Sequence, residues 1–373
     1  MPRPNDALTD PERPAGTAGS SGSGGAAAVL RRVPRLLLSQ YLVVVLTVVY
    51  VLALLPFTDG LLSSGNVANV LSNYWPLLVV AVGQTFVLVV AGIDLSQTSI
   101  MAITNVVAAL LVTQAANPVQ FSKSPFWGNL IGPDGGPLPA SAWGVAVAVV
   151  AAVALGALIG LGNGLAVSRL GMPAFMVTLV SLLFFSALAI WATKSENVVD
   201  LPDAYVWLGS GDLLGVVPVP LLLAGGVAVA AHLLLARTVL GRRLYAVGTN
   251  ARAAAISGVP TARVVTTAYV ISGICATVGA LLYSARLEQG RPTLGANQLL
   301  DVVGACVIGG VSLFGGKGNV LGAALGVLLF VVLANGLNLL QLPFTTVMVV
   351  KGLVILLAAV LDVLRTRGLE GRT

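Results

Sequence analysis

Three charged side chains lie inside long apolar stretches of this chain. Asp94 lies in VLVVAGIDLSQTSIM (residues 87–101), and no other charged residue occurs from Asn66 to Thr113. Asp301 and Lys351 lie in two later apolar stretches. A charge at membrane depth is costly, so such residues usually pair with each other or mark a pathway. Asp301 and Lys351 have opposite charges, and they could form an intramembrane ion pair.

Side chains that could catalyse a reaction or bind a metal are sparse. The only two cysteines, Cys275 and Cys306, lie in apolar runs, and the single histidine, His232, sits near the end of another. These residues form neither a disulfide framework nor a metal-ligand spacing. No loop gathers His, Cys or paired acids, so we expect no metal site and no enzyme active site.

The segment FGGKGN (residues 314–319) invites comparison with a phosphate-binding P-loop. That motif requires G-x-x-x-x-G-K-[ST]. Here Gly318 follows Lys317, and Val311 stands where the first glycine should be. No other segment supplies the motif, so we expect the chain itself to bind no nucleotide.

The composition is that of an integral membrane protein. Of the 373 residues, 57% are apolar and 43 more are glycine, whereas only 9% are charged. Soluble domains carry about 25% charged residues. The net charge of +6 does not indicate nucleic acid, because in a membrane protein the positions of the positive charges matter more than their sum.

Apolar runs of about 20 residues, the length that crosses a bilayer, recur along the chain. We expect an all-α polytopic bundle of about ten transmembrane helices. The predicted spans are 36–57, 67–91, 96–116, 140–167, 173–193, 213–236, 263–287, 295–313, 319–340 and 343–364. Pro76 and Asp301 fall within two of them, so either span could be broken or re-entrant. The four-residue spacing of Gly156, Gly160 and Gly164 predicts close helix packing, as does that of Gly322 and Gly326.

The two ends of the chain are predicted to lie outside the membrane domain, which covers residues 36–364. Residues 1–35 contain GTAGSSGSGG and predict a disordered tail, and residues 365–373 form a short second tail. With the N-terminus inside, most Lys and Arg side chains fall in inner loops, as the positive-inside rule requires. We therefore predict that both termini are cytoplasmic.

The largest inner loop, residues 237–262, predicts a short helix. Asn250 can cap it by accepting a backbone N–H, and residues 251–257 are mostly good helix formers. Gly258 suits a left-handed C-terminal residue, and Pro260 prevents continuation. A helix this short is marginal in water, so it needs a partner to pack against. An ordinary capped connector is the alternative.

This loop resembles the cytoplasmic coupling loop of sugar-importing ABC permeases of the ribose/xylose/galactose type. That pattern runs T-x-x-G-R-x-x-Y-A-x-G-G-N, followed by acid-A-A and S-G. The matching residues are Thr238, Gly241, Arg242, Tyr245, Ala246, Gly248, Asn250, Ala253, Ala254, Ser257 and Gly258. Thr249 replaces a glycine, and Ala251-Arg252 stands where the family often has an acid, which puts an ion pair between that acid and the ATPase in doubt.

Two further segments resemble signatures of the same family. Residues 91–96 match G-G-I-D-L-S through Gly92, Asp94, Leu95 and Ser96, with Ala91 in place of the first glycine. Residues 300–322 and 335–340 match the third signature over nearly their whole length. The resemblance extends from about Asn66 to Asp362. Branched-chain amino-acid permeases share the architecture, but they would be expected to lack the I-D-L-S element.

The resemblance implies a permease subunit of an ATP-driven, binding-protein-dependent importer of a monosaccharide or polyol, working by alternating access in a bacterial inner membrane. It implies an ABC ATPase with two nucleotide-binding domains, which uses the ATP and Mg, an extracytoplasmic sugar-binding protein, and a second permease copy or a paralogue. The residues expected to couple to the ATPase are Gly248, Asn250, Arg252, Ala253, Ala254, Ser257 and Gly258.

The resemblance also suggests roles for the polar residues within the spans. We expect Gly92, Asp94, Leu95 and Ser96 near the cytoplasmic mouth, with Asp94 capping the next helix rather than touching sugar. Residues that could line a sugar path are Gln84, Thr85, Asn105, Asn163, Asn335 and Asn338. Interhelical hydrogen bonds explain these residues equally well.

Two other transporter classes remain as alternatives. An ion-coupled secondary transporter usually carries ionisable residues or broken helices at mid-membrane, and such residues are few here. An ABC permease of the same architecture could carry a non-sugar solute such as a branched-chain amino acid.

Overall fold

The protein is described by a computed structural model that covers residues 41–370. The predicted tail 1–35 and the first residues of the first predicted span lie outside this range. Within it the chain is helical except for loops and one short hairpin, in which strand β1 (Asp212–Leu213) pairs antiparallel with β2 (Val217–Pro218). The all-α prediction is confirmed for these residues.

Six helices in the described part of the chain are long and apolar enough to cross a membrane. They are α3 (Ser64–Val89), α6 (Ala142–Ser168), α7 (Ala174–Thr193), α9 (Val219–Arg237), α12 (Thr261–Arg286) and α14 (Val320–Leu339). Each overlaps one predicted span. Helix α3 runs through Pro76 without a break, so the possible interruption there does not occur.

Four other predicted spans contain shorter apolar helices: α2 (Tyr41–Leu54), α4 (Gln97–Val112), α13 (Leu299–Ile308) and the first part of α15 (Phe344–Glu370). At 1.5 Å per residue, the ten residues of α13 extend about 15 Å, half of the hydrocarbon thickness. The predicted span 295–313 is therefore broken, because residues 309–319 are not helical. Helix α15 continues through residues 365–370 of the predicted C-terminal tail.

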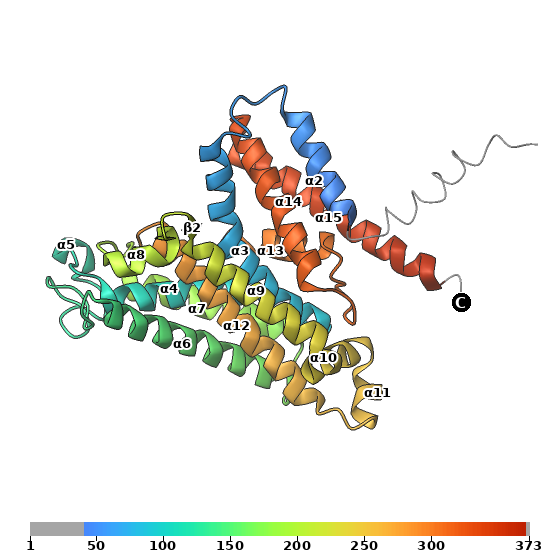
Figure 1. Cartoon of the computed structure of the whole chain (residues 1–373). Helices are drawn as coiled ribbons and strands as arrows, with labels where there is room; N and C mark the ends of the chain where they lie inside the picture. The colour runs from blue at the N-terminus through green and yellow to red at the C-terminus, as the bar shows by residue number, and fades with distance from the viewer. Residues whose placement is uncertain (1–40, 371–373) are drawn as a thin grey trace, which may run out of the picture. The chain divides into compact units, whose positions relative to one another are not determined.

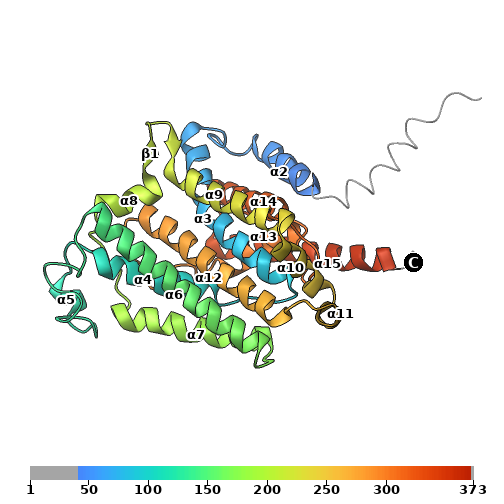
Figure 2. The ribbon, with the colours of Figure 1, turned by 60° about the horizontal axis from the view of Figure 1, so that its bottom comes forward.

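Four further helices lie at the two ends of the bundle. Helices α5 (Pro118–Phe121) and α8 (Asp203–Ser210) lie at the same end as the hairpin, and α10 (Val239–Thr249) and α11 (Ala251–Ile256) lie at the other (Figures 1 and 2). We call these the hairpin end and the α11 end.

Helix α12 is central to the packing, with α6, α3, α4 and α8 against it. Glycines allow α6 to approach it closely. A Cβ atom at Gly160 would collide with the carbonyl oxygen of Tyr269, and one at Gly164 would lie 2.8 Å from the Cα of Thr266. Gly322 and Gly326 of α14 face the backbone of α13 in the same way. The predicted close packing along both glycine rows is confirmed.

Helices α13 and α15 are joined by the predicted ion pair. Lys351 Nζ donates to Asp301 Oδ2 at 2.7 Å, and each side chain is 14% exposed. The two charges thus neutralise each other where water is scarce.

The glycine face of α6 generates a stability prediction. Gly160→Leu should destabilise the protein by about 1–3 kcal/mol, the usual cost of overpacking, because the new side chain meets backbone of α12. Gly162→Leu is the matched control, since a Cβ there would have nothing within 4 Å. Thermal unfolding of the detergent-solubilised protein measures both variants, and equal melting temperatures would contradict the packing described.

The ion pair generates a second prediction. Lys351→Glu should sharply lower the yield of folded protein, because removing one partner of a buried pair typically costs about 3–5 kcal/mol and here adds a like charge. The double variant with Asp301→Lys should restore folding, as measured by the monodisperse yield in size-exclusion chromatography. Failure of the exchange to recover any yield would argue against a direct pair.

Candidate functional site: a surface helix and a polar pocket

The short helix at the α11 end has the predicted geometry. Asn250 Oδ1 accepts a hydrogen bond from the N–H of Ala253 at 2.9 Å, and helix α11 follows directly. Gly258 ends the motif with φ +82°. The side chain of Ile256 is 83% exposed. The predicted capped helix is confirmed, and it presents its surface outward.

The residues expected to couple to an ATPase divide into two groups. Those on the surface are Asn250, Arg252, Ala253, Ser257 and Gly258, whereas Ala254 and Gly248 are buried. Ala254 anchors α11 to the bundle, and Gly248 lies on the buried side of α10. These two residues can support a docking surface but cannot form part of it.

Helix α10 fixes the position of α11. The Thr238 hydroxyl accepts the N–H of Gly241 at 3.1 Å, which caps the helix, and Leu244 is completely buried on its inner face. The Tyr245 hydroxyl donates to the Gly318 carbonyl at 2.7 Å. Burial raises the pKa of Tyr245, so its hydroxyl remains a donor.

Asp94 is fully buried, and the expectation that it caps the next helix is wrong. It lies in the non-helical segment 90–96, and α4 begins only at Gln97, after Ser96. Its Oδ1 accepts the N–H of Ser96 at 3.0 Å together with the Ser96 hydroxyl, and Oδ2 accepts the Ser272 hydroxyl at 2.6 Å. The buried carboxyl group is satisfied by these three donors from the protein.

The hydrogen bonds around Asp94 join four helices. Asn163 of α6 donates to the Ser96 hydroxyl at 2.8 Å. Gln97 of α4 donates to Ser272 of α12 at 2.8 Å and to the Val80 carbonyl of α3 at 3.2 Å. Gly92 is also buried, and Leu95 is half-buried. Asn163 therefore makes an interhelical hydrogen bond within a buried polar network.

Three more of the predicted path residues are completely buried. Thr85 donates to the Ala81 carbonyl at 2.8 Å. Asn105 accepts the N–H of Arg291 at 2.7 Å and so fixes the loop after α12. Gln84 is completely buried, and neither of its amide atoms has a hydrogen-bond partner within residues 41–370.

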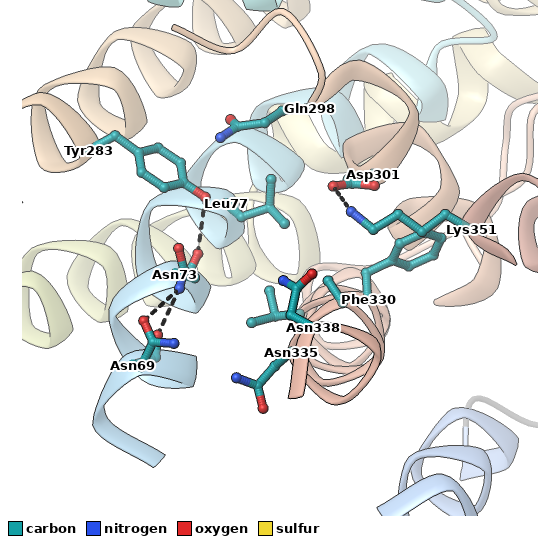
Figure 3. A pocket seen from close by; sticks show the side chains of 12 residues that line it. Asn69, Asn73, Leu77, Tyr283, Gln298, Asp301, Phe330, Asn335, Asn338 and Lys351 are labelled. Carbon is teal, nitrogen blue, oxygen red and sulfur yellow. Dashed lines mark hydrogen bonds and ion pairs between the residues drawn. The ribbon is translucent and has the colours of Figure 1, made fainter. Parts of the chain in front are cut away.

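The remaining two, Asn335 and Asn338, line a polar pocket of about 220 Å³ (Figure 3). Its polar side chains come from α3, α12, α13, α14, α15 and the loop before α13. They are Asn69, Asn73, Tyr283, Gln298, Asp301, Asn335, Asn338 and Lys351. The ion pair therefore forms part of the pocket wall.

Neighbouring residues hold the pocket in shape. Asn335 exchanges two amide hydrogen bonds with Asn66, at 2.8 and 2.9 Å. Arg286 donates to the Oδ1 atoms of Asn73 and Asn69, at 2.8 and 3.0 Å. In contrast, the exposed amide of Asn338 has no hydrogen-bond partner among the residues described, so it is available to a ligand.

Sequence reasoning missed half of these polar side chains. Asn69, Asn73, Tyr283 and Gln298 were not singled out, although Asn69 and Asn73 stand four residues apart and so share one face of a helix. The pocket continues into a second cavity of about 350 Å³, which it joins through Asn73, Tyr283 and Gln298.

The chemistry of the pocket is that of recognition. Amides and a phenol donate and accept hydrogen bonds, and the single acid is already paired with a lysine. No group of three or more His, Cys, Asp or Glu that could hold a metal occurs in the described part of the chain.

Known proteins resemble this chain over most of its length. It is 36% identical over 301 residues to the ribose import permease protein RbsC of Escherichia coli K12. The aligned region covers 80% of this chain and 85% of that protein. The ribose import permease of Bacillus subtilis 168 is 32% identical over 299 residues, covering 80% and 84%. The xylose transport system permease protein XylH of Haemophilus influenzae is 29% identical over 366 residues, covering 82% and 91%.

No solved structure gives a significant match. A family model described as the permease component of branched-chain amino acid transport systems matches residues 66–359, the region that holds both the surface helix and the pocket. This chain belongs to that family of multi-pass membrane permeases and is, like its relatives, a transport subunit.

Proposed function

We propose that this chain forms the membrane passage of an ATP-driven sugar importer, in which a separate ATPase docks on helix α11. The observation that carries this proposal is α11 itself: a capped, exposed helix held at one end of a membrane bundle. Within residues 41–370, only Ala254 of this helix is buried, so the remaining surface is free for a partner.

The proposed orientation places the α11 end in the cytoplasm. Arg242, Arg243 and Arg252 are exposed there, in accord with the positive-inside rule. Both termini would then lie inside if the bundle crosses the membrane an even number of times. The hairpin end would face an extracytoplasmic binding protein that delivers the cargo.

The polar pocket is suited to a monosaccharide or polyol. Its volume of about 220 Å³ lies below the roughly 300–1,000 Å³ of drug-sized sites, and hydroxyl groups need several donors and acceptors wherever they pass. Asn338 supplies both from one amide. The curated relatives import ribose and xylose, which favours sugars over the amino acids in the family description.

Alternating access would follow from movement of the bundle about this pocket. Closure of the two nucleotide-binding domains on ATP would move α11, and opening after hydrolysis would return it. A second permease, identical or paralogous, would provide the docking site for the second ATPase domain.

Docking on α11 can be tested with a charge on its exposed face. Ile256→Asp should weaken co-purification of the ATPase roughly tenfold or more, because losing an interface hot spot costs about 2 kcal/mol. Val216→Asp is the matched control: Val216 is 81% exposed but lies at the hairpin end. Equal loss in both variants would point to general misfolding, and full retention in Ile256→Asp would exclude docking on this face.

Passage of sugar through the pocket can be tested at Asn338. Asn338→Leu keeps the size of the side chain but removes its donor and acceptor, so import should slow up to about tenfold, since each hydrogen bond contributes about 0.5–1.5 kcal/mol. Asn129→Leu, in an exposed loop, should have no effect. Uptake of labelled sugar into vesicles gives the rates, and wild-type uptake by Asn338→Leu would remove the pocket from the path.

A further inference from the structure

Three segments of the chain meet at Gly248 of helix α10. A Cβ atom there would collide with the carbonyl oxygen of Val89 and lie 2.7 Å from the amide nitrogen of Gly316. Val89 is the last residue of α3, and Gly316 lies in the segment 309–319 between α13 and α14. The Gly316 N–H also donates to the Val89 carbonyl at 2.9 Å. The contact is therefore backbone against backbone.

Residues 309–319 are fastened to α10 by a second contact. The Tyr245 hydroxyl, one turn before Gly248, donates to the Gly318 carbonyl at 2.7 Å. Gly316 and Gly318 have φ of +71° and +136°, a conformation that other residues rarely adopt. Ser312 N–H donates to the Lys317 carbonyl at 3.1 Å and closes the loop. The segment is thus a compact link rather than a slack connector.

Helix α3, which ends beside Gly248, and helix α13, which leads into residues 309–319, both form walls of the polar pocket. Helix α3 carries Asn69 and Asn73 to it, and α13 carries Asp301. From Asn73 to Val89 the helix rises about 24 Å at 1.5 Å per residue, so the pocket and the joint lie at opposite ends of one rod. In Figure 1 the loop after α13 reaches toward α10, which leads directly into α11.

We infer that Gly248 is the joint through which displacement of α11 reaches the pocket. This inference rests on the proposed function, because it requires an ATPase that moves α11. A glycine is needed since a side chain would separate α10 from α3 and from residues 309–319, and the three would no longer move together. Glycine within a helix otherwise costs about 0.5–1 kcal/mol relative to alanine.

Close packing alone does not give Gly248 this role. A Cβ atom at Gly160 would also collide with backbone, but Gly160 joins only α6 to α12. Gly248 is a positioning residue: it joins the helix that leads into α11 both to α3 and to residues 309–319, the segment that follows α13. A variant that only loosened packing would lower transport and stability together. Loss of the joint should instead leave ATP hydrolysis intact but uncouple it from sugar import.

The test is the number of sugar molecules imported per ATP hydrolysed by the complete transporter, with ATPase and binding protein, in proteoliposomes. Gly248→Ala should reduce this ratio roughly fivefold or more, the range of typical coupling free energies, while ATPase association and hydrolysis persist. Tyr245→Phe, which removes one hydroxyl, should reduce it about twofold or more. Gly226→Ala in α9, where a Cβ has nothing within 4 Å, should match wild type, and Gly160→Ala should lower the melting temperature but not the ratio.

A wild-type ratio in Gly248→Ala would overturn the inference while leaving the proposed function intact. If that variant does not fold, Tyr245→Phe decides in the same way, because a phenylalanine keeps the ring and its packing. Wild-type import that does not depend on ATP would overturn the proposed function and this inference with it.

Discussion

The need to satisfy every backbone polar group inside a membrane bundle governs this structure. Lipid offers no hydrogen bonds, so backbone that leaves a helix at membrane depth must be enclosed by protein. The segments 90–96 and 309–319 are not helical, and neighbouring parts of the bundle form hydrogen bonds to both. The carboxyl oxygens of Asp94 accept hydrogen bonds from Ser96 and Ser272. The N–H of Gly316 donates a hydrogen bond to the carbonyl oxygen of Val89, the last residue of α3.

The two interruptions differ in how they are held. Each adjoins a helix too short to cross the bilayer by itself, α4 or α13. The segment beside Asp94 is fastened by hydrogen bonds to four helices and is suited to remain fixed. The segment 309–319 instead touches α10 and α3 through glycine backbone, so it is suited to carry motion between the surface helix and the polar pocket.

The features of the fold that depend on residues close together in the sequence, such as apolar spans and helix caps, could be predicted from the sequence. All ten predicted spans overlap an apolar helix because length and hydrophobicity are read directly from the chain, and α11 was predicted from Asn250 and Gly258 because caps are local. The ion pair between Asp301 and Lys351 followed from opposite charge in an apolar setting. Asp94 was misread as a cap because its partner Ser272 lies 178 residues away, and no local pattern brings that hydroxyl to it. The pocket side chains Asn69 and Tyr283 were missed because only tertiary packing unites them.

The proposed coupling requires that ATP binding to an ATPase docked on α11 changes the polar pocket. The test uses the Asn338→Cys variant of a chain in which the buried Cys275 and Cys306 are replaced by alanine. The measurement is the rate at which this single cysteine is modified by a membrane-impermeant thiol reagent added from the hairpin side. We expect the rate in the assembled transporter to change markedly when a non-hydrolysable ATP analogue is added. An unchanged rate in a variant that still imports sugar on ATP would contradict the account.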